Sequence, residues 1–526
     1  MNERHVFDRR WMMYDFARQR YFVKEEFLLL LDTLQRLNYN GLCLYLEGAF
    51  AFPSMPGMIR KGALTPEDAA WIVEEASKRD IAICPITNVV GHMEHFFEQE
   101  RNRSLMSSES PRQIDFLDPR AESFALNIVD EYLAAFQTPL LCVGGDEVVL
   151  TPETKVLYAK FVAKICRYLQ AKGVQPAIFA DMIWMDQELT EEFDRHTLLF
   201  DWNYYGHRPE SVAFFKEKGF TDIVVCTCDN SWEGIINYQR TSGHLRAHTD
   251  IPVQPDEIEA FYQDALAEGC LSAMYCNWGN EEARPPMWSN LVPMARTSLF
   301  LTGQIEAKER CDEKIEELLF GRVTPYTNCT YRFQNEVQRL SDIPLGWFQD
   351  MRRSLFTPSA LRRQLINAQK ELPDFTVSLD APLRSIEKDL LEWFPASSLE
   401  EKGRTALMAN AAMTRAGAAI IDAGCSYTCY QQAARLQFSA PSVASQLVLQ
   451  VKNAFLLAAS QVRAFSDVFA AAISGTGHTK DDLARLAKTA SLLEECADRF
   501  AQVEEDLDRI PLPRFELLLD QVLPKN

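Results

Sequence analysis

The sequence predicts an α/β protein in which a (β/α)8 barrel is followed by an all-α C-terminal domain. Three observations lead to this prediction. The first 300 residues or so alternate short apolar runs with amphipathic stretches, as repeated βαβ units do. The chain of 526 residues is too long for a single hydrophobic core. Beyond about residue 350 the strand-like alternation disappears.

The composition is that of a globular protein, with 47% hydrophobic and 24% charged residues. The excess of 74 acidic over 54 basic residues gives a formal charge of -20. Such a charge repels phosphate backbones and anionic lipid surfaces. We therefore expect no nucleic-acid partner and no membrane partner.

Eight apolar runs have the length of buried strands. Between them lie helical stretches with apolar residues at i, i+3 and i+4. Eight strands with intervening helices in about 300 residues favour a closed barrel over an open doubly wound sheet, since no Gly-x-Gly-x-x-Gly follows the first run. The runs are Met12 to Tyr14, Gly41 to Leu46, Ile81 to Thr87, Leu140 to Val143, Ala177 to Ala180, Thr197 to Trp202, Asp222 to Cys228 and Leu271 to Asn277.

The C-terminal part of the chain is rich in Ala, Leu, Glu, Lys and Arg from about Pro358 onward, which favours helices. The predicted organisation is a barrel over residues 1–305, a connector over 306–350 and a helical domain over 351–526. An Ala-rich helical domain could bury one subunit against another, so a homodimer is one expectation.

The thirteen cysteines are odd in number and scattered without regular spacing. Together with a charged N-terminus that does not resemble a signal peptide, they predict reduced thiols and a cytoplasmic location. The pairs Cys226/Cys228 and Cys425/Cys429 lack a second Cys/His pair at zinc-site spacing, so we interpret them as buried apolar thiols. We expect no metal and no cofactor.

Two adjacent carboxylates follow the fourth predicted strand. Leu140 to Val143 lead through two glycines into Asp146 and Glu147, at the strand end where a barrel of this kind places its reactive groups. Neighbouring like charges tend to raise one pKa, which suits a general acid. The alternative is structural, with Asp146 capping a following helix and Glu147 in its first turn.

Tryptophans lie at or just beyond four successive strand ends. One such residue alone would most often be packing, but four would line one side of the barrel mouth. Aromatic faces are good walls for sugar rings and for a small acyl group. The residues are Trp184, Trp202, Trp232 and Trp278.

Taken together, the motifs resemble glycoside hydrolase family 20, the β-N-acetylhexosaminidases, over roughly residues 7 to 305. Gly144 to Val148 is similar to the family's Gly-Gly-Asp-Glu motif. Arg10 to Arg18 is similar to its strand-one motif Arg-Gly-x-x-x-Asp-x-x-Arg, and Gly91-His92 to its strand-three Gly-His. The resemblance is closest to short members that lack an N-terminal accessory domain.

The resemblance implies a role for each matching residue. Glu147 would be the general acid/base, and Asp146 would orient the substrate's acetamido group. Arg10 would bind sugar hydroxyls, and His92 would belong to a network behind the carboxylates. The remaining implied substrate contacts are Trp184, Trp202 and Trp278 around the acetamido group, Tyr205 as a donor to its oxygen, and Glu47 after strand two.

Two residues depart from the family pattern. Trp11 stands where the family has Gly, and Gly48 where the short members have Asp, so the preferred sugar is open. Three structural alternatives also stay open. His92 could be a hydrogen-bonded core histidine, Arg10 and Asp15 could form an ion pair, and the acidic residues at 281 and 282 could be solvated.

The implied reaction is retaining and substrate-assisted. The substrate's 2-acetamido oxygen would attack the anomeric carbon to give an oxazolinium intermediate, while Glu147 protonates the leaving group and then activates water. One rival hypothesis makes Asp146 or Asp201 a direct nucleophile on 2-hydroxy glycosides. Another is a glycan-binding barrel without turnover.

Overall fold

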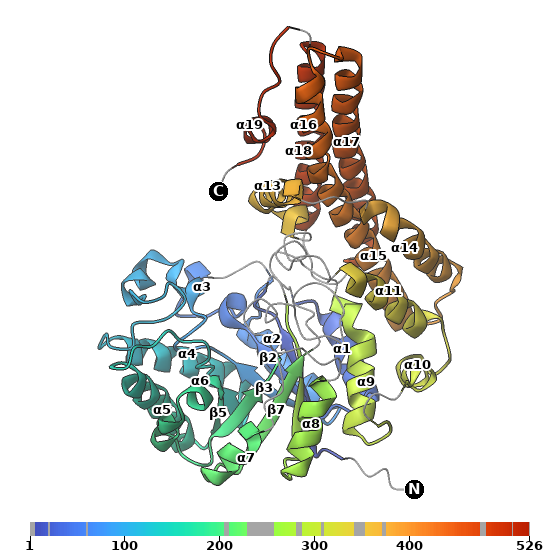
Figure 1. Ribbon diagram of the computed structural model, residues 1–526. Coiled ribbons are helices and arrows are strands. Elements are labelled where there is room, and N and C mark those ends of the chain that lie inside the picture. Colours follow the sequence, from blue (N-terminus) through green and yellow to red (C-terminus); the bar gives the residue numbers. More distant parts are fainter. Residues whose placement is uncertain are drawn as a thin grey trace. The chain divides into compact units, whose positions relative to one another are not determined.

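The structure is a computed structural model that describes residues 6–18, 22–58, 62–204, 210–228, 257–279, 287–306, 310–340, 353–370, 375–473, 480–507 and 509–524. The chain divides into two compact units. The first contains all the described strands and the helices that surround them. The main part of the second begins at Phe320 and is helical (Figure 1).

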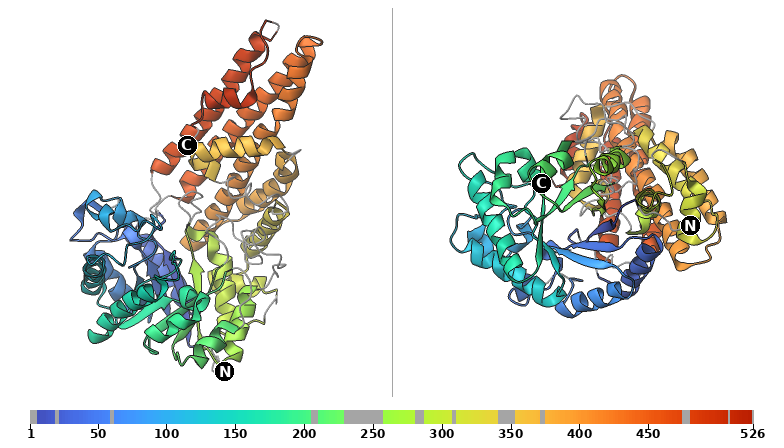
Figure 2. Two further views of the ribbon diagram at one scale, coloured as in Figure 1. Left: turned by 60° about the vertical axis from the view of Figure 1, so that its left-hand side comes forward. Right: turned by 90° about the horizontal axis from the view of Figure 1, so that it is seen from below.

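The first unit is a closed barrel of eight parallel strands in sequence order. Strand β1 closes it by pairing with β2 on one side and β8 on the other. Seen from below, the strands form a ring inside a layer of helices (Figure 2). The strands are β1 Arg9–Asp15, β2 Gly41–Tyr45, β3 Ala82–Ile86, β4 Leu140–Cys142, β5 Gln175–Phe179, β6 Leu198–Trp202, β7 Ile223–Cys228 and β8 Ser272–Asn277.

Each strand of this barrel except the last returns to the next through at least one helix. Helix α2 shows how the sequence starts one: Thr65 accepts from the Asp68 N–H, the Asp68 carboxylate accepts from the Thr65 N–H, and Pro66 follows the cap. The helices are α1 Lys24–Arg36, α2 Pro66–Ser77, α3 Glu94–Phe97, α4 Ala121–Phe136, α5 Lys155–Ala171, α6 Asp181–Met185, α7 Glu210–Glu217, α8 Glu257–Ala267, α9 Leu291–Leu301 and α10 Asp312–Phe320.

Trp11, the first departure from the family pattern, packs inside the barrel. It is 6% exposed and meets the Phe200 ring edge-on at a centroid distance of 6.3 Å. Its register partner on β2 is Gly41, and a Cβ at Gly41 would overlap the indole. The absence of a side chain at Gly41 therefore makes room for the bulky residue on β1.

The turn after β4 needs glycine. Gly144 and Gly145 have φ angles of +71° and +94°, which residues with a Cβ rarely adopt. A Cβ at Gly144 would also overlap the Asn88 side chain. The backbone that carries Asp146 and Glu147 is thus set by two residues without side chains.

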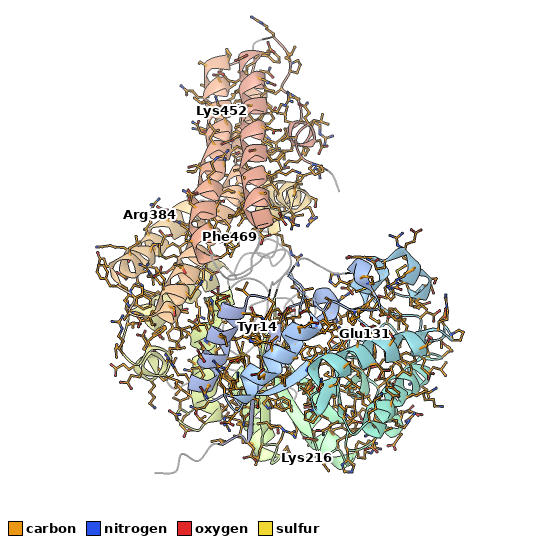
Figure 3. All side chains as sticks on the ribbon, turned by 180° about the vertical axis from the view of Figure 1, so that it is seen from behind. Tyr14, Glu131, Lys216, Arg384, Lys452 and Phe469 are labelled. Carbon is orange, nitrogen blue, oxygen red and sulfur yellow. The ribbon has the colours of Figure 1, made fainter. Side chains whose placement is uncertain are left out.

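The second unit is a helical bundle. Its core is built from small and aromatic side chains, including Ala416, Phe455, Phe469 and Phe500; Phe469 is labelled in Figure 3. The helices are α11 Tyr326–Leu340, α13 Pro358–Asn367, α14 Phe375–Glu392, α15 Ser398–Cys425, α16 Tyr427–Leu436, α17 Pro441–Ala472, α18 Lys480–Glu505 and α19 Phe515–Asp520.

Helix α17 is long and apolar enough to cross a membrane by length and composition alone, with a mean hydropathy of 1.2 over its most apolar window. It is the one such helix among the described residues. Its buried side, including Val448, Phe455 and Phe465, belongs to the bundle core. A core helix of a helical bundle has the same composition.

The predicted fold class, a (β/α)8 barrel followed by a helical region, is confirmed. Each of the eight predicted apolar runs overlaps one of the eight strands. Beyond residue 350, every secondary-structure element among the described residues is a helix. The range 306–350, predicted as a connector, contains all of α10 and all of α11 within its described residues.

Replacing Gly144 with Ala is expected to destabilise the barrel more than replacing Gly173. Both have left-handed φ angles, +71° and +76°, but only Gly144 has neighbours within 4 Å of a new Cβ. Left-handed backbone strain alone costs about 1 kcal/mol or slightly more, and overpacking against Asn88 adds roughly 1–3 kcal/mol. Urea unfolding of the two variants measures the difference. Equal losses would show that the Asn88 contact imposes no constraint.

Candidate active site

The polar cluster at the mouth of the barrel is centred on His92. Its Nε2 lies 3.5 Å from Asp146 Oδ2 and 3.2 Å from Glu147 Oε2. His92 follows Gly91, and a Cβ at Gly91 would come within 2.5 Å of the Asp146 backbone oxygen. The glycine therefore lets the turn after β3 approach the turn after β4, which brings the histidine to both carboxylates.

The two adjacent carboxylates have different surroundings. The Glu147 side chain is 51% exposed, while that of Asp146 is 9% exposed. Hydrogen bonding from His92, together with the positive charges of Arg112 and Arg18, lowers the pKa of Glu147 against the opposing effect of burial. Glu147 is therefore accessible from solvent at the barrel mouth, and the resting protein holds it as a carboxylate.

Two buried carboxylate oxygens next to Glu147 have no donor among the described residues, namely Asp146 Oδ1 and Asp181 Oδ1. Asp181 Oδ2 accepts from the Glu147 backbone N–H at 3.0 Å. Burial, and then the charge of Asp146, raise the pKa of Asp181 to about 7. Buried carboxylate oxygens rarely remain without donors, so a ligand N–H or O–H is the natural partner of the Asp146 oxygen.

The other ring nitrogen of His92 faces Arg112. Nη2 of Arg112 lies 2.5 Å from Nδ1, and Glu47 Oε1 lies 4.0 Å from the same atom. Burial lowers the pKa of His92, but Asp146, Glu147 and Glu47 outweigh it and raise the pKa. The histidine is thus a hydrogen-bonded member of the carboxylate cluster.

Glu47 is buried and multiply contacted. Its Oε1 accepts from Tyr45 Oη at 2.7 Å and lies 3.6 Å from Arg18 Nη2, and its Oε2 lies 3.4 Å from His95 Nε2. Burial raises the pKa of Glu47, while Arg18, His92 and His95 lower it in part.

Arg18 is a largely buried cation at this mouth. It lies 3.1 Å from Asp15 Oδ2, and its guanidinium carbon is 4.9 Å from the Tyr45 ring centroid and 5.2 Å from that of Trp278. Burial alone would lower the pKa of Arg18, but the charges of Asp15 and Glu47 outweigh burial and raise the pKa above its ordinary value. Asp15 Oδ2 also accepts from the Gly279 N–H at 2.8 Å, which joins the ends of β1 and β8.

Aromatic rings line the side of the mouth formed by β6 and β8. Trp202 stacks on Tyr204 at a centroid distance of 5.0 Å. Trp278 meets Tyr45 edge-on at 4.9 Å and Tyr204 at 6.5 Å. Two of the predicted tryptophans therefore belong to one continuous aromatic wall, together with two tyrosines.

Three of the polar residues at the mouth have left-handed backbones. The φ angles are +40° at Glu47, +51° at His92 and +51° at Glu147. Non-glycine residues in this region cost of order 1–3 kcal/mol and cluster at functional sites. The backbone is therefore strained at three residues of the candidate active site.

The predicted place of Arg10 in the site is wrong. Its Nε donates to the Asn38 oxygen at 2.8 Å and its Nη1 to the Phe7 oxygen at 2.7 Å, both at the N-terminal end of the barrel. It precedes Asp15 by five residues, about 16 Å along a strand. Arg18, the last residue of the same motif, lies at the mouth instead. The alternative ion pair of Arg10 with Asp15 is also excluded, because Asp15 pairs with Arg18.

Trp184 is placed differently from the other aromatic residues. Short helix α6 carries it to α7, where its ring packs edge-on against Phe214 at 5.6 Å and Phe215 at 6.2 Å. Its contacts do not support a place in the acetamido wall. Tyr205 and Trp232 lie outside the described residues, as do residues 281 and 282.

Asp181 is a site residue whose role the sequence did not indicate. It was visible only as the acidic residue after the fifth strand, and nothing in its spacing linked it to the Glu147 backbone. The structure brings six of the predicted residues to the mouth, namely Asp146, Glu147, His92, Glu47, Trp202 and Trp278.

Residues 7–230 match the model of "Glycosyl hydrolase family 20, catalytic domain". These residues belong to glycosyl hydrolase family 20. The match covers the described strands β1 to β7 and the turn that carries Asp146 and Glu147. It confirms the family that the motifs indicated.

Similar proteins include a lacto-N-biosidase of Bifidobacterium bifidum, 23% identical over 182 residues, which cover 30% of this chain and 16% of that protein. Among solved structures, a β-N-acetylhexosaminidase from Bacteroides fragilis is 17% identical, covering 60% of this chain and 69% of its own at a TM-score of 0.44. A chitobiase from Flavobacterium johnsoniae is 14% identical, covering 98% and 75% at a TM-score of 0.46.

Asp181 should make the stability of the barrel depend on pH. Its folded pKa of about 7 lies above the ordinary value of 3.8, so the folded protein binds the proton more tightly than the unfolded chain. The stabilisation that the protonated Asp181 gives the folded state is fully present below about pH 4 and is lost as the pH rises through 7. Asp181→Asn removes the titration, so wild-type protein should lose stability relative to the variant between pH 5 and pH 8, measured by urea unfolding.

Asp118→Asn is the matched control for this measurement. The side-chain and backbone hydrogen bonds from Arg120 lower the pKa of Asp118 to about 2, so it stays ionised in both states across this range. The difference from wild type should be flat. A flat difference for Asp181→Asn as well would contradict the assigned titration.

Proposed function

We propose that the barrel is a retaining exo-glycosidase that removes terminal 2-acetamido-2-deoxy-β-hexosides, with GlcNAc or GalNAc as the released sugar. Membership of family 20 supports a glycoside hydrolase. The observation that carries the proposal is the contrast between the two adjacent carboxylates. Glu147 is half-exposed at the barrel mouth, whereas Asp146 is buried with one oxygen that lacks a donor among the described residues.

In the proposed reaction, the acetamido oxygen of the substrate attacks the anomeric carbon and the glycosidic bond breaks. Asp146 Oδ1 accepts the acetamido N–H and offsets the positive charge that develops on the ring being formed. Glu147 gives its proton to the departing oxygen and then takes one from the water that opens the oxazolinium. The configuration at the anomeric carbon is retained.

In this proposal, other groups at the mouth bind the sugar and exclude water. Trp202, Tyr204 and Trp278 form the apolar wall for the sugar ring and the acetamido methyl group. Arg18, fixed by Asp15 and Glu47, lies beside the rings of Tyr45 and Trp278 and suits sugar hydroxyls. Arg18 therefore binds the sugar hydroxyls in this proposal, the role that the motif resemblance implied for Arg10.

We also propose a cytoplasmic location. All thirteen cysteines are free, and twelve of them are buried. Fractionation of the cells that make the protein tests this. A strictly secreted protein would contradict it.

Glu147→Gln should slow hydrolysis of a substrate with a sugar leaving group by about 100- to 10,000-fold, because that oxygen needs a proton. For an aryl leaving group that departs as an anion, the loss in the first step should shrink markedly. Asp146→Asn should be slow on both substrates, since the acetamido nucleophile must attack in each case. Steady-state kcat/KM for the four combinations measures this. Equal leaving-group dependence in the two variants would contradict the assigned roles.

A stable thiazoline mimic of the cyclic intermediate should inhibit the protein far more strongly than the free 2-acetamido sugar. A site shaped for the transition state binds such mimics about 100-fold or more tighter than substrate. Inhibition constants on an aryl 2-acetamido glycoside measure the ratio. Turnover of plain 2-hydroxy glycosides without thiazoline inhibition would favour the direct nucleophile, and binding without any turnover would favour a glycan-binding barrel.

A further inference from the structure

The imidazole of His92 is contacted on its two sides by groups that favour different protonation states. On the Nε2 side lie the carboxylates of Asp146 and Glu147, at 3.5 and 3.2 Å. On the Nδ1 side Arg112 Nη2 lies at 2.5 Å, and Glu47 Oε1 lies farther away at 4.0 Å. Against the opposing effect of burial, the carboxylates on both sides favour a doubly protonated ring and raise the pKa of His92 to about 10, whereas the guanidinium in contact with Nδ1 opposes a proton on that nitrogen.

The Arg112 contact determines which nitrogen carries the proton. A guanidinium has five N–H donors and no acceptor, so in this contact Nδ1 must offer its lone pair. A neutral ring with its lone pair on Nδ1 carries its proton on Nε2. A doubly protonated ring would instead direct an N–H against an N–H of Arg112 across 2.5 Å.

We propose that Arg112 is a positioning residue that holds His92 as the Nε2–H tautomer and thereby makes it a constant hydrogen-bond donor to Glu147. The inference rests on the proposed function only in naming Glu147 as the general acid. The tautomer itself is a property of the resting protein. Its consequence is that Glu147 stays ionised until the pH is low enough for it to take the proton that the leaving group needs.

Arg112 is anchored beside the histidine by its own backbone and by a neighbouring charge. Its carbonyl oxygen accepts from the Met93 N–H at 2.9 Å, and its Nε lies 3.5 Å from Glu94 Oε1. The side chain is 51% exposed. It can therefore be replaced without leaving a buried cavity.

The charged groups facing the histidine fix the expected result of removing Arg112. These are Glu47 after β2, Arg112 beyond α3, and Asp146 and Glu147 after β4. Without the guanidinium, the Glu47 carboxylate is the charged group that faces Nδ1. The ring then takes a second proton from solvent and donates to carboxylates from both nitrogens.

The positive charge would in that case move from Arg112 to His92, whose Nε2 lies only 3.2 Å from Glu147 Oε2. A nearer opposite charge lowers a carboxyl pKa further. Arg18 and Asp181, which also face Glu147, stay unchanged. The alkaline limb of the kcat/KM profile, which reports the general acid of the free enzyme, should move to lower pH by about one unit.

The decisive measurement is the ¹⁵N NMR spectrum of the full-length protein with labelled histidine rings at pH 7, with the His92 signals assigned by their loss in His92→Asn. Wild-type protein and Arg112→Lys, which keeps a donor, should show a proton on Nε2 and none on Nδ1. Arg112→Met should show both nitrogens protonated. Arg120→Met, which removes an exposed arginine paired with Asp118, is the control and should match wild type.

A doubly protonated His92 in wild-type protein, or an unchanged ring in Arg112→Met, would overturn the proposal. A pH profile of Arg112→Met whose alkaline limb stays in place would do the same. Because the spectra need no substrate, they decide the role of Arg112 even if no glycoside is hydrolysed. Absence of turnover on every glycoside would instead count against the proposed function.

Discussion

The hydrogen-bonding distance between His92 Nε2 and Glu147 Oε2 is the constraint on which the rest of the barrel mouth depends. To bring the ring there, the turn after β3 must approach the turn after β4 so closely that only glycine fits at position 91. The same contact places three carboxylates around one imidazole. These acidic groups are tolerated at the mouth because Arg18 and Arg112 offset their charge and the imidazole donates a hydrogen bond to Glu147.

The fold was predictable because its determinants are local and repeated. Apolar runs of strand length alternate with amphipathic helices, and the carboxyl ends of parallel strands meet at one end of a barrel. This reasoning places Asp146, Glu147, His92 and Trp278 at the same end of the barrel. It needed only the order of the strands and the side on which each strand ends.

The residues that were misplaced share a physical cause. A motif gives spacing along the chain, but a strand rises more than 3 Å per residue, so Arg10 and Arg18 cannot serve the same end of β1. Trp184 follows its strand by a turn of helix, and that turn carries the ring toward α7. Asp181 contacts Glu147 through a backbone N–H, which no side-chain pattern reveals.

The left-handed residues of the barrel fall into two groups at opposite ends. Glu47, His92 and Glu147 lie in turns that follow strands, while the other described non-glycine residues with positive φ follow helices α1, α2 and α4, namely Asn38, Asp80 and Gln137. Glycine would relieve the backbone in either group. In the first group it would delete a side chain of the site, and in the second it would not. Thermostability and chemistry are therefore separable along the barrel axis, and an engineer can relax one end while leaving the other under strain.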